Sequence, residues 1–412
     1  MIKNKKFMLL FSGTFFSSFG DALLFVVLLS LLQQTGVGGV GTSLFLVFSA
    51  LPVLLFGLHA GAYVENKSLQ KVMVYSDAVR ILIVVLFFIS SLFLLDSKVL
   101  IYSLIFLITF VNIFFSTASS TLIPNILSQE EIPKANSFFR IINMVAKLIA
   151  YGFAAILFTW GVSDNAKILL AAAFYLSSLI IISRIKPYVQ NKLMDSSNPK
   201  VSLTTSMKEG LSYIRSNDAV FRLFIIFGLG WIIGASIDIY LITYLAEVIG
   251  KGADSLYLIA TPTFIGILIG SLISPILYRK IDKKYGFLFS LFTFSVVILC
   301  FSLEMPFIFL QILLVIGGLS QGILNIFMVS FLQTNVNPNY LARVFSVYNI
   351  IITGASLPGY LLIGYFIDVL GVIHLGFVIA GYLCLVGIIC LITIPSLRKG
   401  GERLKGKVAL AK

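Results

Sequence analysis

The chain has 412 residues, of which 59 % are hydrophobic and 11 % are charged, and its formal net charge is +13. Apolar runs dominate the sequence and indicate a membrane protein. The basic excess is then explained by membrane topology and anionic lipid, and a nucleic-acid ligand is not needed to account for it.

Twelve apolar runs are each long enough to cross the hydrocarbon core of a bilayer, which takes about 20 residues of helix. They must be helices rather than open strands, because lipid cannot satisfy backbone polar groups. In chain order, the predicted spans are 7–32, 40–63, 72–94, 98–122, 137–159, 166–186, 220–246, 255–278, 286–303, 307–334, 344–368 and 373–395.

Basic residues lie almost entirely on one side of these spans. The two tails and the even-numbered gaps hold 24 of the 30 Lys and Arg residues, whereas the odd-numbered gaps hold only Lys98, Lys167 and Lys251. Positive residues near span ends stay in the cytoplasm, so both termini are predicted to be cytoplasmic.

A polar stretch at 187–219 divides the spans into two sets of six. Equal halves are typical of transporters built from internal repeats. The predicted organisation is therefore an all-α membrane protein with a six-helix bundle at 1–186, a linker at 187–219, a second bundle at 220–395 and a basic tail at 396–412.

Glycines recur at four-residue spacing in the spans, where they would let two helix backbones approach closely. Ordinary helix packing and a sliding surface between the two halves are both compatible with this spacing. The pairs are Gly57/Gly61, Gly230/Gly234, Gly266/Gly270 and Gly318/Gly322.

Motifs for catalysis and cofactors do not point to an enzyme. The chain has no phosphate-binding loop of the G-x-x-x-x-G-K-[ST] type, and the G-x-G-x-x-G at Gly36 to Gly41 lacks the strand that a dinucleotide site needs. The three cysteines lie in predicted spans without metal-ligand spacing. We expect no enzymatic activity, no cofactor, no metal and no disulfide.

The gap between the second and third spans carries a recognisable motif. Gly57, Gly61, Glu65 and Lys71 are followed by Asp77 and Arg80 at the start of span 3. This segment resembles the G-x-x-x-D-R-x-x-x-R/K loop of the major facilitator superfamily, with Glu65 and Asn66 in place of the usual Asp and Arg. On this resemblance, these six residues are the candidates for a gating loop.

Further segments are similar to the macrolide-efflux and siderophore-exporter branch of that superfamily. They run from Pro124-Asn125 to Ala135-Asn136, from Arg343 to Ser346, and from Pro358-Gly359 to Asp368. The resemblance implies two bundles that rock around a site near the bilayer midplane.

Ionisable residues within spans are costly and are therefore candidates for function. Asp21 in span 1, Lys147 in span 5 and Asp238 in span 7 are the candidates for proton coupling. We expect Asp21 and Lys147 to lie close enough to couple, although a purely structural pair would explain them too. Asp77 and Arg80, at an i, i+3 spacing, also fit an intrahelical pair.

Aromatic and amide residues on helices that line the cavity in that superfamily are the candidates for substrate contact. Amides within a span seek a partner or water. The candidates are Phe16, Phe110, Asn112, Trp231, Tyr240, Gln321 and Asn325.

The combined expectation is a monomeric, proton-coupled exporter of amphipathic small molecules, of drug or macrolide type, in the inner or plasma membrane of a bacterium. Its partners are then a small-molecule substrate, protons and the lipid bilayer. Two alternatives stay open: export of one endogenous metabolite such as a siderophore, and lipid flipping on the same fold. A non-transporting membrane sensor is a third class.

Overall fold

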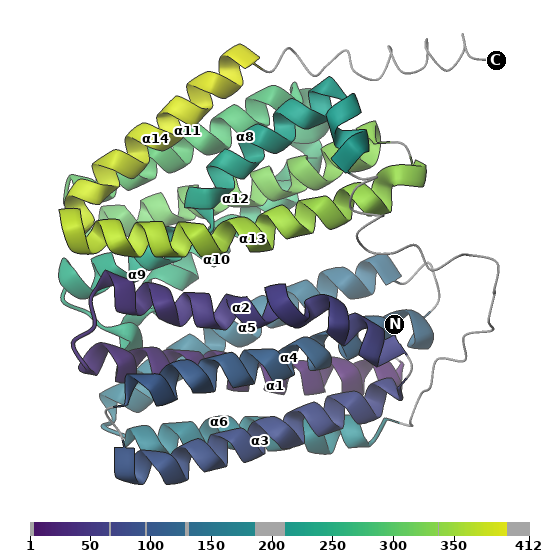
Figure 1. Ribbon diagram of the computed structural model, residues 1–412, viewed down its shortest axis with the longest axis vertical. Helices are drawn as coiled ribbons and strands as arrows, with labels where there is room; N and C mark the ends of the chain where they lie inside the picture. The colour runs from purple at the N-terminus through teal and green to yellow at the C-terminus, as the bar shows by residue number, and fades with distance from the viewer. Residues whose placement is uncertain are drawn as a thin grey trace. The chain divides into compact units, whose positions relative to one another are not determined.

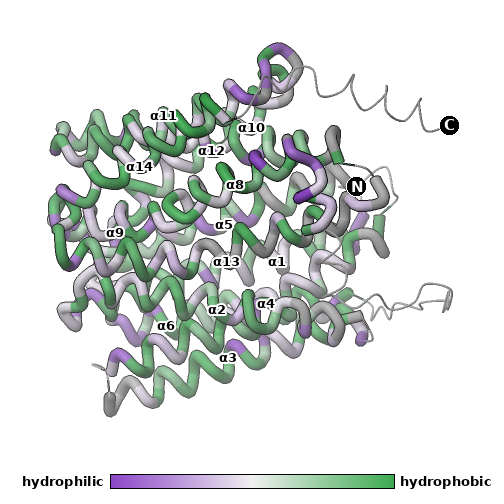
Figure 2. The backbone as a smooth tube through the Cα atoms, turned by 45° about the horizontal axis from the view of Figure 1, so that its top comes forward, coloured by the Kyte–Doolittle hydropathy of each residue, from purple (hydrophilic) through white to green (hydrophobic). Residues whose placement is uncertain are grey.

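The computed structural model describes residues 4–65, 67–94, 97–127, 132–185, 211–336 and 338–393, and apart from one isolated bridge residue its regular structure is helical throughout (Figure 1). Hydrophobic residues run along the helices, and hydrophilic ones lie mainly near helix ends (Figure 2). The helical prediction is confirmed for these residues.

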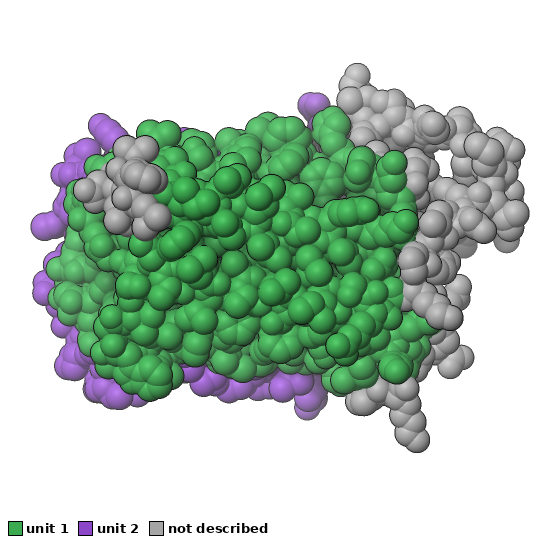
Figure 3. Space-filling view, turned by 90° about the horizontal axis from the view of Figure 1, so that it is seen from below, with its two compact units in different colours: residues 1–195, 245–257 green, residues 196–244, 258–412 purple. Residues whose placement is uncertain are grey.

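The chain divides into two compact units (Figure 3). Unit 1 contains residues 1–195 and 245–257, and unit 2 contains residues 196–244 and 258–412. Most of the predicted linker and the whole predicted basic tail lie outside the described residues, at 186–210 and 394–412.

The described residues of unit 1 form six long helices. Asn4 begins the first by accepting hydrogen bonds from the backbone N–H groups of Lys6 and Phe7, as an N-cap does. The helices are α1 (Lys5–Gln34), α2 (Gly39–Glu65), α3 (Leu69–Leu94), α4 (Lys98–Ile126), α5 (Ile132–Thr159) and α6 (Asp164–Ser183).

Within unit 1, α1 is the central helix and packs against α4, α5 and α6. Its buried residues recur along its whole length, from Phe7 to Leu32, as expected of a helix that is apolar on all sides. Helix α3 packs against α4 and α6, and α2 packs against α4. The short 3-10 turn η1 (Ala253–Ser255) also belongs to this unit, where the Ala253 N–H donates to the Gln33 side chain at 2.9 Å.

In unit 2, the first predicted span is broken into two helices. Helix α8 ends at Gly234, Ala235 and Ser236 form a turn, and α9 begins at Ile237. The helices of this part of the chain are α8 (Asp218–Gly234), α9 (Ile237–Glu247), α10 (Tyr257–Lys280), α11 (Lys283–Ser302), α12 (Phe307–Asn335), α13 (Pro338–Leu370) and α14 (Val372–Thr393).

Every predicted span coincides with a helix or, for 220–246, with the broken pair. Eleven described segments are long and apolar enough to cross a membrane. The predicted span at 344–368 falls within α13, where the described apolar stretch is the shorter Ser356–Leu370.

The backbones of α10 and α12 approach each other closely at glycines on both helices. A Cβ atom added to Gly266 or Gly270 would overlap the backbone of Val315 or Leu319. The reverse also holds, because a Cβ at Gly318 would overlap the carbonyl oxygen of Thr263. Gly322 meets the backbone of α10 in the same way. The two predicted pairs therefore serve close packing within one unit.

Candidate functional site

Four helices of unit 1 each contribute two polar or aromatic side chains to one buried cluster. In each helix the two residues are three or four positions apart, which places them on the same face. The members are Ser17 and Asp21 on α1, Asp77 and Arg80 on α3, Asn112 and Phe115 on α4, and Tyr175 and Ser178 on α6. We call these eight residues the Arg80 cluster.

Arg80 lies at the centre, with a fully buried side chain. Its Nη1 donates to the Ser17 hydroxyl at 2.6 Å and lies 3.3 Å from Asp77 Oδ1. Its Nη2 donates to Asn112 Oδ1 at 3.0 Å. A planar guanidinium is suited to such divergent acceptors, because its donors point in fixed directions.

Aromatic rings lie on the Arg80 guanidinium. The Phe115 ring centroid is 4.9 Å from Arg80 Cζ and the Tyr175 centroid is 5.3 Å from it, both within the range of cation–π attraction. Such contacts partly offset the loss of water around a buried cation. The cluster thus holds a charge that would otherwise be costly in the membrane interior.

Two carboxylates share this guanidinium. Asp77 is fully buried and accepts hydrogen bonds from Ser17 at 3.2 Å and from Ser178 at 2.7 Å. Asp21 Oδ1 lies 3.5 Å from Arg80 Nη1 and accepts from the Tyr175 hydroxyl at 2.8 Å. With both carboxylates ionised, the cluster has one negative charge more than positive.

Of the three charged groups, Asp21 alone is accessible, with 22 % of its side chain exposed, while Arg80 and Asp77 are at 0 %. The intrahelical pair of Asp77 and Arg80 was predicted, whereas Asp21 and Asn112 were singled out but not placed beside that pair. Four members of the cluster were not predicted, because their only sequence signal is the i, i+3 or i, i+4 spacing of common residue types: Tyr175, Ser178, Ser17 and Phe115.

Asp21 and Lys147 were expected to lie close enough to couple. Asp21 lies against α3 and α6, and no ion pair joins it to Lys147 among the described residues. Ala146 and Ala150 of α5 pack against α1 beside Phe19 and Ala22. Lys147 follows Ala146, so it is rotated by about 100° around α5 and is exposed.

Asp238, the third predicted proton-coupling residue, belongs to unit 2 and is exposed in the first turn of α9. It follows the break at Ala235–Ser236, and a carboxylate in a first helical turn is favoured by the helix dipole.

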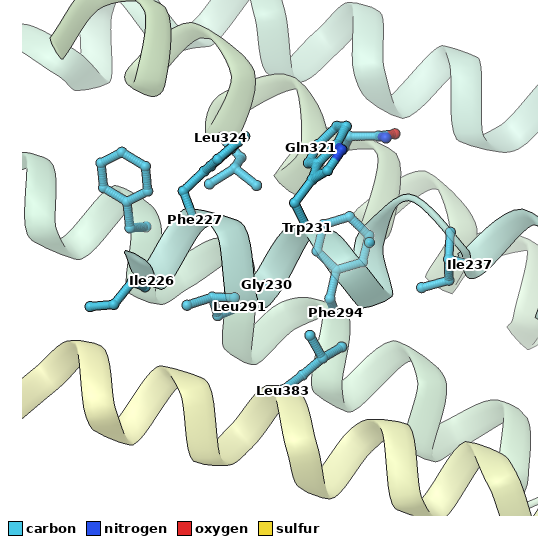
Figure 4. A pocket seen from close by; sticks show the side chains of 12 residues that line it. Ile226, Phe227, Gly230, Trp231, Ile237, Leu291, Phe294, Gln321, Leu324 and Leu383 are labelled. Carbon is cyan, nitrogen blue, oxygen red and sulfur yellow. The ribbon is translucent and has the colours of Figure 1, made fainter. Parts of the chain in front are cut away.

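Two of the predicted cavity residues, Trp231 and Gln321, line a pocket inside unit 2 (Figure 4). The other residues lining this pocket are apolar side chains or glycines of α8, α9, α11, α12 and α14. They are Ile226, Phe227, Gly230, Gly234, Ile237, Phe287, Leu291, Phe294, Leu324 and Leu383.

The other cavity candidates lie elsewhere. Phe16 stacks on Phe174 in unit 1, and Phe110 packs edge-to-face on Phe56. Tyr240 is fully buried, with its hydroxyl 3.5 Å from that of Ser302. The Asn325 amide donates to the backbone oxygen of Gln321 at 3.2 Å.

The predicted gating segment is described only in part. Gly57 lies in α2 with open space beside it, and Lys71 is exposed on α3. The surroundings of Gly61 and the side chain of Glu65 lie outside the described residues. No cluster of three or more metal-ligand side chains occurs in the part of the chain that the structure describes.

Comparison with known proteins decides the family. The sequence profile of the Major Facilitator Superfamily matches residues 10–359 and 244–410. The chain belongs to this superfamily. It is therefore a multi-pass membrane transporter, and its relatives are transporters rather than enzymes.

Two relatives are similar over nearly their whole length. Macrolide efflux protein A of Streptococcus pyogenes is 23 % identical over 410 residues, which cover 93 % of this chain and 95 % of that protein. The uncharacterized MFS-type transporter YvqJ of Bacillus subtilis strain 168 is 23 % identical over 379 residues, covering 90 % and 88 %. The predicted resemblance to the macrolide-efflux branch is confirmed.

Solved structures share the fold. A mutant of the nucleoside transporter NupG superimposes with a TM-score of 0.79 at 12 % identity, over 95 % of this chain and 100 % of that one. A POT family transporter in complex with a thioalcohol conjugated peptide gives 0.74 at 14 % identity, over 95 % and 96 %. At such identity the likeness concerns the fold alone.

Proposed function

We propose that this transporter is a proton-coupled exporter of amphipathic small molecules, of the drug or macrolide type, and that it works by alternating access. The observation that carries the proposal is the Arg80 cluster, in which Asp21 and Asp77 share one guanidinium and Asp21 is partly exposed.

The proposed chemistry follows from the charge balance of this cluster. Asp77 is fully buried between Arg80, Ser17 and Ser178, so it stays bound to them. Asp21 is more exposed and more distant from Arg80, so it is the group that exchanges a proton with water. A proton on Asp21 makes the cluster neutral, and its release restores one negative charge. A charge that changes within the membrane is a means of coupling transport to a gradient.

The choice of an export substrate rests on the relatives. Macrolide efflux protein A is similar over almost the whole chain, which favours outward transport of an amphipathic molecule. The distribution of Lys and Arg favours twelve spans with both termini in the cytoplasm, in the plasma membrane of a bacterium. We propose that a single chain is the transporting unit.

Flux of lipophilic dyes and macrolides in proteoliposomes, with and without an imposed pH gradient, tests the proposal. We expect flux that depends on the gradient. Flux that is indifferent to the gradient would overturn proton coupling, and no flux from folded protein would overturn the substrate class.

The variant Asp21→Asn tests the assigned residue, because the Asn oxygen can still accept from Tyr175 while the side chain no longer titrates. We expect its remaining flux to lose its dependence on pH. Asp218→Asn is the matched control, since Asp218 is 73 % exposed and pairs with Arg222 at the surface. A pH profile in Asp21→Asn equal to that of the parent protein would remove Asp21 from the coupling step.

A further inference from the structure

The pocket inside unit 2 has the composition of a ligand site. Helices α8, α11, α12 and α14 supply most of its walls, and Figure 4 shows their side chains directed into a common space. The cavity volume that a water-sized sphere can reach is about 40 Å³, within an empty space of about 570 Å³ that includes open solvent. No charged residue lines it, so no ion pair is available there to offset the desolvation of a charged group.

One wall of the pocket consists of two aromatic side chains, Phe227 and Trp231, whose orientation is fixed by neighbouring residues. The rings of Phe227 and Trp231 are stacked, with centroids 5.4 Å apart and planes 18° apart. The Trp231 indole N–H donates to the Ile352 carbonyl oxygen at 2.9 Å. Tyr348 packs against Phe227 at 5.3 Å. Because the indole donor is already used, Trp231 offers an incoming group the face of its ring rather than a hydrogen bond.

A single polar side chain lines the pocket. Gln321 on α12 is half-buried, and its side-chain amide makes no hydrogen bond to the described residues. Asn325, one turn away, donates to the Gln321 backbone oxygen and not to its amide. A primary amide in apolar surroundings is most stable when it has a partner, so Gln321 points to a ligand with one hydrogen-bonding atom.

Glycines keep the pocket open on the α8 side. A Cβ added at Gly234 would meet no atom within 4 Å, and one at Gly230 would meet Leu291 Cδ2 at 3.2 Å. Open space thus lies beside Gly234, which lines the pocket. A larger residue there would occupy the pocket without a backbone clash.

We propose that this pocket binds an uncharged, planar ring group that carries one hydrogen-bonding oxygen or nitrogen, and that the group is part of the transported molecule. The ring lies against Trp231 and Phe227, and its polar atom bonds to Gln321. The link to transport rests on the proposed function, whereas the binding itself does not. A flat ring fits this site better than a lipid chain does, because stacked aromatic faces and a lone amide favour planar groups with a polar atom.

Binding can be observed through Trp231 itself. The chain has two tryptophans. The other, Trp160, is 76 % exposed at the end of α5, so Trp160→Phe leaves Trp231 as the sole donor of tryptophan fluorescence. The probe is 1-aminoanthracene, a planar aromatic amine that is neutral at pH 7, added to the full chain in lipid nanodiscs. We expect saturable energy transfer from Trp231 to the probe.

Substitutions then locate the probe. In the Trp160→Phe background, Gly234→Leu should abolish saturable transfer. Gly228→Leu adds the same side chain to α8 away from the pocket and should retain it. Gln321→Leu keeps the volume but removes the amide, and should weaken binding about three- to tenfold. Unchanged affinity in both Gly234→Leu and Gln321→Leu would overturn the site.

Competing ligands distinguish a ring group from an aliphatic chain, and Asp21→Asn distinguishes a failure of the pocket proposal from a failure of the proposed function. We expect 2-naphthol to displace the probe and tridecane not to; the opposite result would overturn the ring assignment in favour of an aliphatic chain. Asp21→Asn should bind the probe as the parent does. Normal binding together with absent gradient-driven flux would contradict the proposed function alone, whereas normal flux without saturable binding would contradict this pocket alone.

Discussion

Arg80 on α3 lies 3.5 Å from the Asp21 carboxylate on α1, and the same Nη1 atom lies 3.3 Å from Asp77 on its own helix. One buried guanidinium therefore balances two carboxylates that differ in exposure. Asp77 is enclosed together with Arg80, whereas Asp21 is partly exposed, which is why the proposed function assigns the proton exchange to Asp21.

Removal of Arg80 should destabilise unit 1 strongly. Arg80→Met leaves Asp77 buried without its cation, and breaking a buried pair from one side costs about 3–5 kcal/mol. We expect a large fall in the thermal unfolding midpoint of the purified protein. The double variant Arg80→Met/Asp77→Met should recover much of the loss, because no unpaired buried charge remains at that position. Equal midpoints for the single and double variants would contradict this account.

The helices could be predicted from the sequence, and several members of the Arg80 cluster could be identified from it as candidates. A charged or amide residue within an apolar run stands out, as Asp21, Arg80 and Asn112 do. Their grouping was not predictable, because the rotation of one helix against another depends on the packing contacts among α1, α3, α4 and α6. Tyr175 gives no sequence signal, since the chain has 17 tyrosines.

The same limit applies to Lys147. The position of Lys147 within the fifth span was predicted from sequence, but the face of α5 on which its side chain lies was not. A neighbouring residue on a helix points about 100° away, so the buried position of Ala146 directs Lys147 elsewhere. The break between α8 and α9 was also not predicted, because a continuous apolar run crosses it.

The α10–α12 contact should not tolerate a side chain at its glycines. Gly318→Ala would place a methyl group on the Thr263 carbonyl oxygen, and the two backbones would have to separate. Overpacking of this kind costs about 1–3 kcal/mol. We expect a lower unfolding midpoint and a smaller monodisperse fraction in size-exclusion chromatography.

Gly381→Ala on α14 is the control for this contact, because a Cβ there meets nothing within 4 Å. That variant should be neutral or slightly stabilising, since alanine is the better helix former. A Gly318→Ala protein as stable as Gly381→Ala would show that the two helices do not pack this closely.

Lys167 should stabilise the turn between α5 and α6 although it is one of only three basic residues in the predicted outer gaps. Its Nζ lies 2.9 Å from Asp164 and 3.4 Å from the Phe158 ring centroid, and its side chain is 4 % exposed. Lys167→Met should cost about 1–2 kcal/mol through the lost cation–π contact. Lys98→Met, at an exposed outer position, should leave the unfolding midpoint unchanged, and equal effects of both would contradict the assignment.

Lys147 should matter for transport and not for stability. It is exposed on α5 at the level where Ala146 packs beside Ala22, and no ion pair of its ammonium group occurs among the described residues. Lys147→Met removes a charge from the middle of a span without breaking a pair, so the unfolding midpoint should stay equal or rise. Gradient-driven flux should fall, and Lys147→Arg, which keeps the charge, should retain most of it. A Met variant with full flux would exclude Lys147 from coupling and leave Asp21 as the titrating group in unit 1.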